Sequence, residues 1–389
     1  MPYFYEFFAG GGMVRAALNE EPGWDCLLAN DNDPKKQAIY KSNWGQGELI
    51  ADSIESLSAQ DLPYRPDLSW ASFPCQDLSL AGVGGGLGAH RSGTFWPFWK
   101  LMTQLDSEGR APRIVTLENV YGALRSHKGQ DFASIAKAFT DSGYRFGALV
   151  VDAVDFVPQS RPRLFVIGVH PEVPVPGHLL QDGPTEPYHP QAVLDGYNNI
   201  PEEARGLWLW WHLPQPAFRE ADLIDLIEPD PEDVEWHPRD HTQRLLSMMT
   251  PANLAKVEQA KNAARPMVGG VYRRTRQGQQ RAEVRFDGVS GCLRTPSGGS
   301  SKQTLLFVDG DDIRSRLLSG REAARLMGLP EWYQLPDRYT DTYHMAGDGV
   351  VVPVVRHITR SIFNPILNAC EQDLFTHGVP RADETVEGA

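Results

Sequence analysis

Short apolar runs alternate with longer amphipathic stretches from residue 1 to about residue 170. The apolar runs have the length of buried strands, and the amphipathic stretches repeat with the period of a helix. The predicted strands are Tyr3–Phe8, Cys26–Asn30, Leu68–Ser72, Ile114–Leu117, Gly147–Asp152 and Leu164–Gly168. The predicted helices are Met13–Glu20, Asp33–Asn43, Phe95–Leu105 and Gln130–Asp141. This alternation predicts a doubly wound α/β domain.

The pattern changes after His170, where prolines at 171, 174, 176, 184, 187 and 190 interrupt any periodicity. We expect a second domain to begin there. Asp240–Ala264 has a helical pattern, and Gly269–Leu293 alternates in the way that hairpin strands do. Val350–Asn368 is predicted to be a helix that returns to the α/β domain, and the polar tail after Thr376 is predicted to be loose.

The length of 389 residues allows two domains of ~100–200 residues each. A content of 41% hydrophobic and 22% charged residues is that of an ordinary globular protein. No apolar stretch approaches the ~18–20 residues of a membrane span, and the start MPYFYEFFAG lacks the basic region of a secretion signal. We therefore expect a cytoplasmic protein.

The formal net charge of −13 disfavours a nucleic-acid partner, because affinity for the phosphate backbone comes largely from Lys and Arg. The distribution of charge changes this picture, since arginines cluster between Arg265 and Arg285 while acids concentrate from Glu220 to Asp240. A local basic face is therefore possible. The four cysteines have no C-x-x-C spacing, so neither a zinc site nor a disulfide framework is indicated. Any functional cysteine is expected to act as a thiol.

A glycine-rich turn, Phe8-Ala9-Gly10-Gly11-Gly12, directly follows the first predicted strand and precedes a helix. Glycines let the backbone turn tightly and approach a ligand at the carboxyl edge of a sheet. Asp31 ends the next strand about twenty residues on, the spacing at which a carboxylate accepts hydrogen bonds from ribose hydroxyls. Because the full G-x-G-x-x-G pattern is missing, we favour S-adenosylmethionine over NAD. A tight turn beside a solvated acid would explain the same residues without a ligand.

Cys75 lies in Phe73-Pro74-Cys75-Gln76, immediately after the predicted strand Leu68–Ser72. Catalytic groups are found at such carboxyl ends of strands, and the glycines from Gly82 to Gly88 are typical of a loop that moves. A lone cysteine, however, is more often a small buried hydrophobic residue. Taken alone, Cys75 leaves both interpretations open.

Two further polar motifs adjoin predicted strands. Glu118-Asn119-Val120 follows Ile114–Leu117, and Gln159-Ser160-Arg161-Pro162-Arg163 leads into Leu164–Gly168. Each is compatible with an ordinary surface ion pair. All of these motifs nevertheless lie at strand ends that should share one edge of the sheet.

The order and the gaps of these motifs resemble the motif series of the cytosine-5 DNA methyltransferase family, of the bacterial restriction-modification or orphan type. The motifs that carry this resemblance are Phe8-Ala9-Gly10, Pro74-Cys75-Gln76, Glu118-Asn119-Val120 and Gln159-x-Arg161-x-Arg163. Three more are similar to the family's loop-closing motif, its domain-organising helix and its last cofactor motif: Arg91-Ser92-Gly93-Thr94, Arg321–Leu326 and Gly347-Asp348-Gly349-Val350. The resemblance runs from residue 8 to about 360, and families of this kind vary freely over the part corresponding to Pro171–Gly291.

The chain departs from the family pattern at two places on the cofactor side. The last motif of the family normally reads Gly-Asn-Ser-Val, and Asp348 and Gly349 stand here in place of Asn and Ser. After the acid at Asp31 the family often carries a large residue that packs on adenine, whereas this chain has Asn32. Neither departure involves the nucleophile.

The resemblance implies a doubly wound mixed sheet of the Rossmann-like methyltransferase type with a second, smaller target-recognition domain. We expect the cofactor-binding catalytic domain at residues 1–170 and the recognition domain, including Arg321–Leu326, at 171–341. A return to the catalytic domain at 342–375 and a flexible tail at 376–389 complete the predicted organisation. Trp208, Trp210 and Trp211 are expected to fill the core of the smaller domain.

The resemblance also implies a mechanism. Carbon 5 of cytosine is too electron-poor to attack a methyl sulfonium, so Cys75 would first add to carbon 6, with Arg161 or Arg163 helping to ionise the thiol. Protonated Glu118 would bond ring nitrogen 3, and Arg163 would hold the carbonyl oxygen of the base. The base would be flipped out of the duplex to reach this pocket. No metal is required.

Cofactor and DNA contacts follow from the same resemblance. Contacts to S-adenosylmethionine, which leaves as S-adenosylhomocysteine, are expected at Phe8, Ala9, Gly10, Gly12, Asp31, Asn32, Asp52, Pro74, Asp348, Gly349 and Val350. Contacts to DNA are expected at Gln76, Ser79 and Arg91. We add Arg273, Arg274 and Arg276, because Arg reads guanine and grips phosphate, although a solvated charged hairpin explains them equally well.

The predicted protein is a monomer that binds double-stranded DNA, with a restriction endonuclease that acts separately as a further possible partner. A tRNA cytosine-5 methyltransferase would share the motifs but usually has a shorter recognition region. An NAD-type oxidoreductase would explain the glycine turn and Asp31 but not Cys75, Glu118 and Arg163. A DNA-binding protein without catalysis is the remaining alternative.

Overall fold

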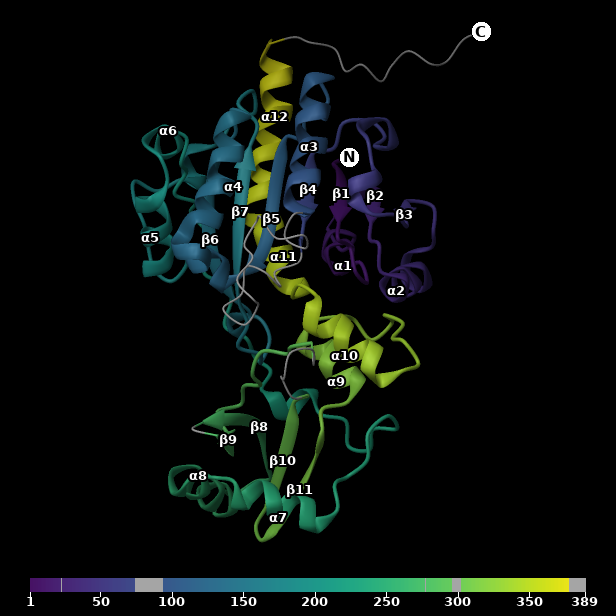
Figure 1. Ribbon diagram of the computed structural model, residues 1–389, viewed down its shortest axis with the longest axis vertical. Coiled ribbons are helices and arrows are strands. Elements are labelled where there is room, and N and C mark those ends of the chain that lie inside the picture. Colours follow the sequence, from purple (N-terminus) through teal and green to yellow (C-terminus); the bar gives the residue numbers. More distant parts are fainter. Residues whose placement is uncertain (22, 74–93, 277, 296–301, 378–389) are drawn as a thin grey trace.

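The computed structural model describes residues 1–21, 23–73, 94–276, 278–295 and 302–377. These parts form an elongated molecule with a large sheet and its helices at one end and a small sheet at the other (Figure 1). Helices α9 (Gly320–Leu326) and α10 (Tyr339–Asp348) lie between the two ends.

The described part of the large sheet has the strand order β3-β2-β1-β4-β5-β7-β6. Neighbours from β3 to β5 pair in parallel, while β7 runs antiparallel to both β5 and β6. The strands are β1 (Tyr3–Phe7), β2 (Asp25–Asn30), β3 (Leu49–Ile50), β4 (Leu68–Ala71), β5 (Ile114–Val120), β6 (Arg145–Asp152) and β7 (Pro162–Val169). This mixed, doubly wound sheet confirms the predicted fold class. Only β3 was absent from the prediction, because two residues are too few to show a period.

Helices cover both faces of the large sheet (Figure 1). One face packs on α1 (Met13–Leu18), α11 (Val352–Ile358) and α12 (Asn364–His377), and the other packs on α3 (Phe95–Ser107), α4 (Gln130–Asp141) and α5 (Gln191–Asn199). Helix α2 (Pro34–Trp44) begins after its N-cap Asp33 and packs beside β2. A π-helical turn, Thr359–Phe363, joins α11 to α12 within the single predicted helix. None of the helices in the described ranges is both long and apolar enough to cross a membrane.

The segment after residue 171 continues to pack on the large sheet. Backbone hydrogen bonds join Phe146 of the edge strand β6 to Leu207 and Leu209, and a side chain at Gly147 would lie 1.9 Å from the Leu209 carbonyl oxygen. Trp208 and Trp211 are buried against the two faces of this sheet. The prediction that these tryptophans fill the core of the smaller domain is therefore wrong, because their segment covers the open edge of β6.

The small sheet is antiparallel in the order β11-β10-β8-β9. Its strands are β8 (Met267–Arg276), β9 (Gln279–Arg285), β10 (Thr304–Asp309) and β11 (Asp312–Leu317). Helices α7 (Arg239–Ser247) and α8 (Pro251–Lys261) cover one face through a core that includes Val257, Ala282 and Leu306. They replace the single predicted helix Asp240–Ala264, because Thr250 precedes a proline and is extended there.

Candidate active site

The polar motifs of the sequence meet at one edge of the large sheet. The glycine turn follows β1, Asp31 follows β2 and Glu118 lies near the carboxyl end of β5. Since β7 is antiparallel, its first residues lie at the same edge, and Arg163 pairs with Val120 across the two backbones. Pro74, Cys75, Gln76, Ser79 and Arg91 lie outside the described residues.

Glu118 and Arg163 form a buried ion pair at this edge. Arg163 Nε lies 3.3 Å from Glu118 Oε1, and the exposed fractions of the two side chains are 14% and 8%. Burial raises the pKa of the Glu118 carboxyl above its ordinary value, although the positive charges of Arg163 and Arg161 and a hydrogen bond with Ser72 oppose the shift. The carboxyl therefore keeps its proton to a higher pH than an exposed glutamate, which lets it act as a hydrogen-bond donor.

Asn119 fixes the chain immediately before the cysteine motif. Its side-chain amide donates a hydrogen bond of 3.3 Å to the Phe73 carbonyl, and both residues are buried. Ser72, one residue earlier, accepts a hydrogen bond of 2.9 Å from Trp70 Nε1. The backbone leading to Pro74 and Cys75 is thus anchored to the neighbouring strand beside Glu118.

Arg161 directs its guanidinium group at backbone carbonyls. It donates to the carbonyl oxygens of Leu293, Gly347 and Gly349 at 2.7, 2.8 and 2.7 Å and lies 3.5 Å from Cys292 Sγ. The side chain is 1% exposed. Arg161 therefore joins the sheet edge to the last motif and to the segment between β9 and β10. Of the two arginines, Arg163 is the one that pairs with Glu118.

The glycine turn is joined to Asp31 by a hydrogen bond. Gly10 has φ +56° and its amide donates to Asp31 Oδ2 at 2.8 Å, while Asp33 N donates to Asp31 Oδ1 at 2.9 Å. A Cβ added at Gly10 would meet nothing within 4 Å, so open space adjoins the turn. Burial raises the pKa of Asp31. An open turn beside a fixed carboxylate fits the ribose end of an adenosine-type cofactor.

The other residues expected on the cofactor side lie around this turn. Asn32 and Asp52 are exposed, and the Asp52 carbonyl accepts a hydrogen bond of 2.8 Å from Asn30 Nδ2 just after β3. Phe8 is half-buried with φ +57°, whereas Ala9 is buried. These contacts place Asp52 one strand away from Asp31 on the same edge of the sheet.

The last motif shows how the chain accommodates its departures from the family pattern. Asp348 lies 3.0 Å from Lys36 Nζ of α2 and also contacts the Thr295 hydroxyl. A Cβ at Gly349 would lie 2.2 Å from Met13 Sδ on α1, so the space that a serine side chain would need is filled. Val350, which follows, is buried. The charge at 348 is thus paired, and a side chain at 349 would require Met13 to move.

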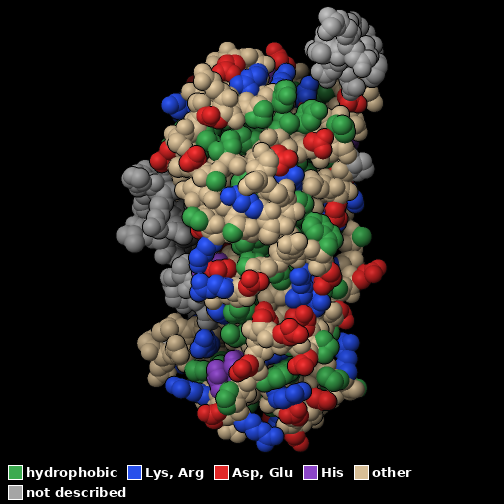
Figure 2. All heavy atoms as spheres, turned by 90° about the vertical axis from the view of Figure 1, so that its right-hand side faces the viewer, with side chains coloured by type: hydrophobic (Ala, Val, Ile, Leu, Met, Phe, Trp, Pro, Cys, Tyr) green, Lys and Arg blue, Asp and Glu red, His purple; other side chains and the backbone are tan. Residues whose placement is uncertain are grey.

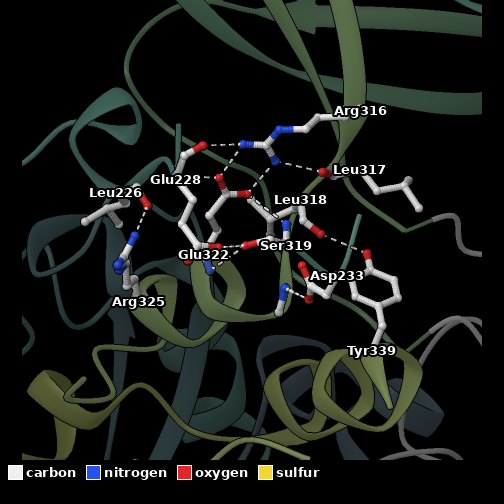
Figure 3. A network of polar contacts seen from close by, with 11 residues as sticks. Leu226, Glu228, Asp233, Arg316, Leu317, Leu318, Ser319, Glu322, Arg325 and Tyr339 are labelled. Carbon is white, nitrogen blue, oxygen red and sulfur yellow. Dashed lines mark hydrogen bonds and ion pairs between the residues drawn. The ribbon is translucent and has the colours of Figure 1, made fainter. Parts of the chain in front are cut away.

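Helix α9 is held by a buried polar network (Figure 3). Arg316 of β11 binds Glu322 of α9 with two hydrogen bonds, at 2.6 and 2.8 Å, and both side chains have no exposed surface. Ser319 and Glu322 form a capping box at the start of the helix. At the other end, Gln159 Nε2 donates to the Leu326 carbonyl at 2.8 Å. Helix α9 therefore connects the small sheet to the edge of the large one.

The arginines expected to read DNA do not share one surface. Arg273 and Arg274 are both exposed but are adjacent on β8, so their side chains point to opposite faces of the small sheet. Arg273 is paired with Ala282, whose side chain faces α8, whereas Arg274 lies 3.8 Å from Glu283 on the other face. The Arg276 backbone pairs with Gln279 near the hairpin turn.

The side of the molecule that carries α2 and α10 shows Lys and Arg intermingled with Asp and Glu (Figure 2). Two lysines of α2 are paired with acids of α10, with 2.9 Å between Lys35 and Asp341 and 3.0 Å between Lys36 and Asp348. The described part of this side therefore offers no broad basic field to a phosphate backbone.

Sequence reasoning missed the residues that support the site from a distance. Trp44 and Tyr333 both donate to the carbonyl oxygen of Gly11, at 3.0 and 2.7 Å, and Lys36 and Thr295 contact Asp348. These partners are far apart along the chain, so no local motif announces them. Lys36 alone had a weak signal, since it lies in the first turn of the helix that follows Asp31.

The family described as C-5 cytosine-specific DNA methylase matches residues 3–364 of this chain. Type II methyltransferase M.HhaI of Haemophilus parahaemolyticus is 25% identical over 361 residues, which cover 92% of this chain and 93% of that protein. Type II methyltransferase M.Bsp6I of Bacillus sp. (strain RFL6) is 26% identical over 367 residues, with 92% and 98% covered.

Solved structures show the same fold. The S. pombe Dnmt2 methyltransferase has a TM-score of 0.58 and 18% identity and covers 94% of this chain and 99% of its own. The Entamoeba histolytica methyltransferase EhMeth has a TM-score of 0.60 and 14% identity, with 94% and 98% covered. The family match confirms both the resemblance and the predicted class of enzyme. The chain thus belongs to the C-5 cytosine-specific DNA methylases, a family of S-adenosylmethionine-dependent methyltransferases.

Proposed function

We propose that this chain transfers a methyl group from S-adenosylmethionine to carbon 5 of a flipped-out cytosine in a specific duplex DNA site, through a covalent bond to Cys75. The observation that carries the proposal is the largely buried pair of Glu118 and Arg163, at the same edge of the sheet as the glycine turn. A carboxyl with a raised pKa and a guanidinium form a hydrogen-bonding surface suited to one edge of a pyrimidine ring.

The proposed reaction begins at the Cys75 sulfur. The thiolate adds to carbon 6 of cytosine, and the new C–S bond makes the ring enamine-like, so that carbon 5 becomes nucleophilic. S-adenosylmethionine supplies the methyl group that carbon 5 accepts. S-adenosylhomocysteine is the product left by the methyl donor. Transfer of the carbon 5 proton to water then expels the cysteine sulfur as a thiolate and restores the aromatic ring. No metal enters this sequence.

Glu118 and Arg163 assist the addition in different ways. Protonated Glu118 bonds ring nitrogen 3 and withdraws electrons as the sulfur adds, and Arg163 holds the carbonyl oxygen of the base. Arg163 also supplies positive charge that favours the thiolate. Arg161 supports the site indirectly, because its hydrogen bonds fix the last motif and the segment between β9 and β10.

The proposed cofactor site is built from three strand ends and the last motif. The Asp31 carboxylate accepts hydrogen bonds from the ribose hydroxyls, and the turn Phe8–Gly12 lets the backbone approach the cofactor. Asp52 and Asn32 border the adenine, and the segment Asp348–Val350 borders the opposite end with Pro74. These roles follow from the family pattern and from the open space beside Gly10.

The small sheet with α7 and α8 is the proposed recognition domain. Arg274 is its leading candidate for a base or phosphate contact, because it is exposed on the face without α7 and α8. Arg273 and Arg276 remain candidates for phosphate contacts beside Gln76, Ser79 and Arg91. We propose a monomer that acts on double-stranded DNA, with a restriction endonuclease acting separately.

Duplex DNA with 5-fluorocytosine at the target site tests the covalent step. In the presence of S-adenosylmethionine we expect a denaturation-resistant adduct on Cys75, because fluorine cannot leave as a proton does. The variant Cys75→Ala should form no adduct, and unmodified duplex should be methylated in preference to tRNA. Absence of an adduct on a site that the enzyme otherwise methylates would remove the covalent mechanism.

A further inference from the structure

Helix α2 is joined to the segment around α10 at several points along its length. Besides the ion pairs of Lys35 and Lys36 with α10, Asn43 exchanges two hydrogen bonds with the Gln334 backbone, at 3.0 and 2.8 Å. The rings of Trp44 and Trp332 meet edge to face, 5.6 Å apart. Residues from the far end of the chain therefore form the outer wall of the glycine turn.

Tyr333 is the member of this segment that reaches the turn itself. Its side chain is fully buried, and its hydroxyl donates to the Gly11 carbonyl oxygen at 2.7 Å. Trp44 Nε1 donates to the same oxygen at 3.0 Å. Because burial raises the pKa of Tyr333, the phenol stays protonated and remains a donor at any physiological pH.

These two donors fix one end of a peptide plane whose other end is also bonded. The next amide, Gly12 N, donates to the Ala9 carbonyl at 2.7 Å, so both polar atoms of the Gly11–Gly12 peptide are held. The donors also explain the glycines, since a Cβ at Gly11 would lie 2.4 Å from the Tyr333 hydroxyl and one at Gly12 would lie 2.3 Å from Trp44 Nε1. The inner surface of the turn is packed, while Gly10 faces open space.

We propose that Tyr333 is a positioning residue that holds the glycine turn in its cofactor-binding conformation from the segment that follows helix α9. The inference rests on the proposed function, namely that this turn binds S-adenosylmethionine. Arg321 of α9 donates to the Tyr333 carbonyl at 3.1 Å, so the organising helix and the turn are joined through one residue.

The substitution Tyr333→Phe removes the hydroxyl and keeps the ring. We expect the Kd for S-adenosylmethionine and for S-adenosylhomocysteine, measured by calorimetry, to rise about two- to tenfold, the range for one buried hydrogen bond. The KM for the cofactor should rise similarly, while the KM for DNA stays unchanged. Trp44→Phe removes the other donor to the same oxygen, should act in the same direction, and provides the test if Tyr333→Phe fails to fold.

Tyr144→Phe is the matched control. Tyr144 is equally buried and donates to the Pro112 carbonyl at 2.8 Å, but at the opposite end of the strands. Both tyrosine variants should lower the Tm comparably, and only Tyr333→Phe should weaken cofactor binding. Equal cofactor affinity in Tyr333→Phe and in the unmodified protein would overturn the inference.

Asp31→Ala separates this inference from the proposed cofactor site. If Asp31→Ala weakens cofactor binding and Tyr333→Phe does not, the positioning role of Tyr333 fails alone. If Asp31→Ala leaves binding intact, the proposed site fails, and the inference with it.

Discussion

A buried carboxyl group that must donate a hydrogen bond near neutral pH needs a pKa above that of an exposed glutamate. Glu118 meets this need because it lies in the sheet interior, where desolvation outweighs the attraction of Arg163 and Arg161. The ion pair with Arg163 holds the group in one orientation. Glu118 therefore combines a retained proton with a fixed orientation, as the proposed addition to the pyrimidine ring requires.

The pH dependence of stability tests the state of Glu118. Because its folded-state pKa is above the ordinary 4.5, the unfolded chain releases this proton first, and the free energy of unfolding falls as pH rises from 4.5 through the raised value. The substitution Glu118→Gln removes this pH-dependent fall in the free energy of unfolding. The Gln variant should therefore gain stability over the unmodified protein more at pH 8 than at pH 5, as thermal unfolding measures.

The same variant should lose activity, because glutamine cannot donate a proton as the sulfur adds. We expect kcat to fall by about 10²- to 10⁴-fold, the usual contribution of a general acid. In the unmodified protein kcat should decline as pH rises through the pKa of Glu118, since the protonated form is the active one in the proposed mechanism.

In the stability experiment, an equal difference between Glu118→Gln and the unmodified protein at pH 5 and at pH 8 would contradict a raised pKa of Glu118.

At the scale of elements, Gly349 lies between helices α10 and α11, where the chain contacts helix α1. Met13 is buried on α1, and its sulfur occupies the space that a side chain at 349 would need. The family's serine at this position would therefore displace the end of the Met13 side chain from its present place. Changes at the two positions should be energetically coupled.

A double-mutant cycle tests this coupling. Gly349→Ser should lower the free energy of unfolding by about 1–3 kcal/mol through overpacking, and Met13→Ala by about 2–5 kcal/mol through a cavity. The double variant should lose less stability than the sum of the two single losses, because the serine fills part of the cavity. Urea unfolding supplies the three values, and strict additivity would refute the steric account.

Periodicity predicted most strands of the large sheet and several of its helices, but it did not predict α5, α10, β10 or β11. Helix α4 occupies the residues predicted for it, and α2 begins directly after the Asp33 cap. The prediction failed at β3, which has two residues, and at the tryptophans near residue 210, whose apolar character does not say which core they join. The local sequence shows the period of an element but not which other element it packs against.

At the scale of the whole molecule, the same limit applies to the candidate site. Local motifs point to Glu118 and Asp31, because each follows a strand of recognisable pattern. They say nothing of the contacts from Arg161 to Gly349 or from Tyr333 to Gly11, which join residues 188 and 322 positions apart. Such pairs leave no trace in a window of one helix or strand, so only the fold reveals them.

The two ends of the molecule are joined through α9, and the Arg316–Glu322 pair is the centre of that junction (Figure 3). Glu322 also accepts hydrogen bonds from the amides of Ser319 and Glu228. Each charge is fully buried, so it depends on the other for compensation. The orientation of the small sheet relative to the proposed cofactor site therefore depends on this pair, and the loss of either member should be costly.

Arg316→Met or Glu322→Gln alone should lower the free energy of unfolding by about 3–5 kcal/mol, since each leaves an uncompensated buried charge. The double variant removes both charges, so its loss should be smaller than the sum of the two single losses, although the glutamine oxygen can accept from only one of the two amides, which bond different carboxylate oxygens of Glu322. Asp141→Asn, in the exposed pair with Lys137, should change stability by less than about 1 kcal/mol and serves as the control. Guanidinium unfolding measures all four. Single losses no larger than that of Asp141→Asn would show that the junction is held by the apolar contacts of α9 instead.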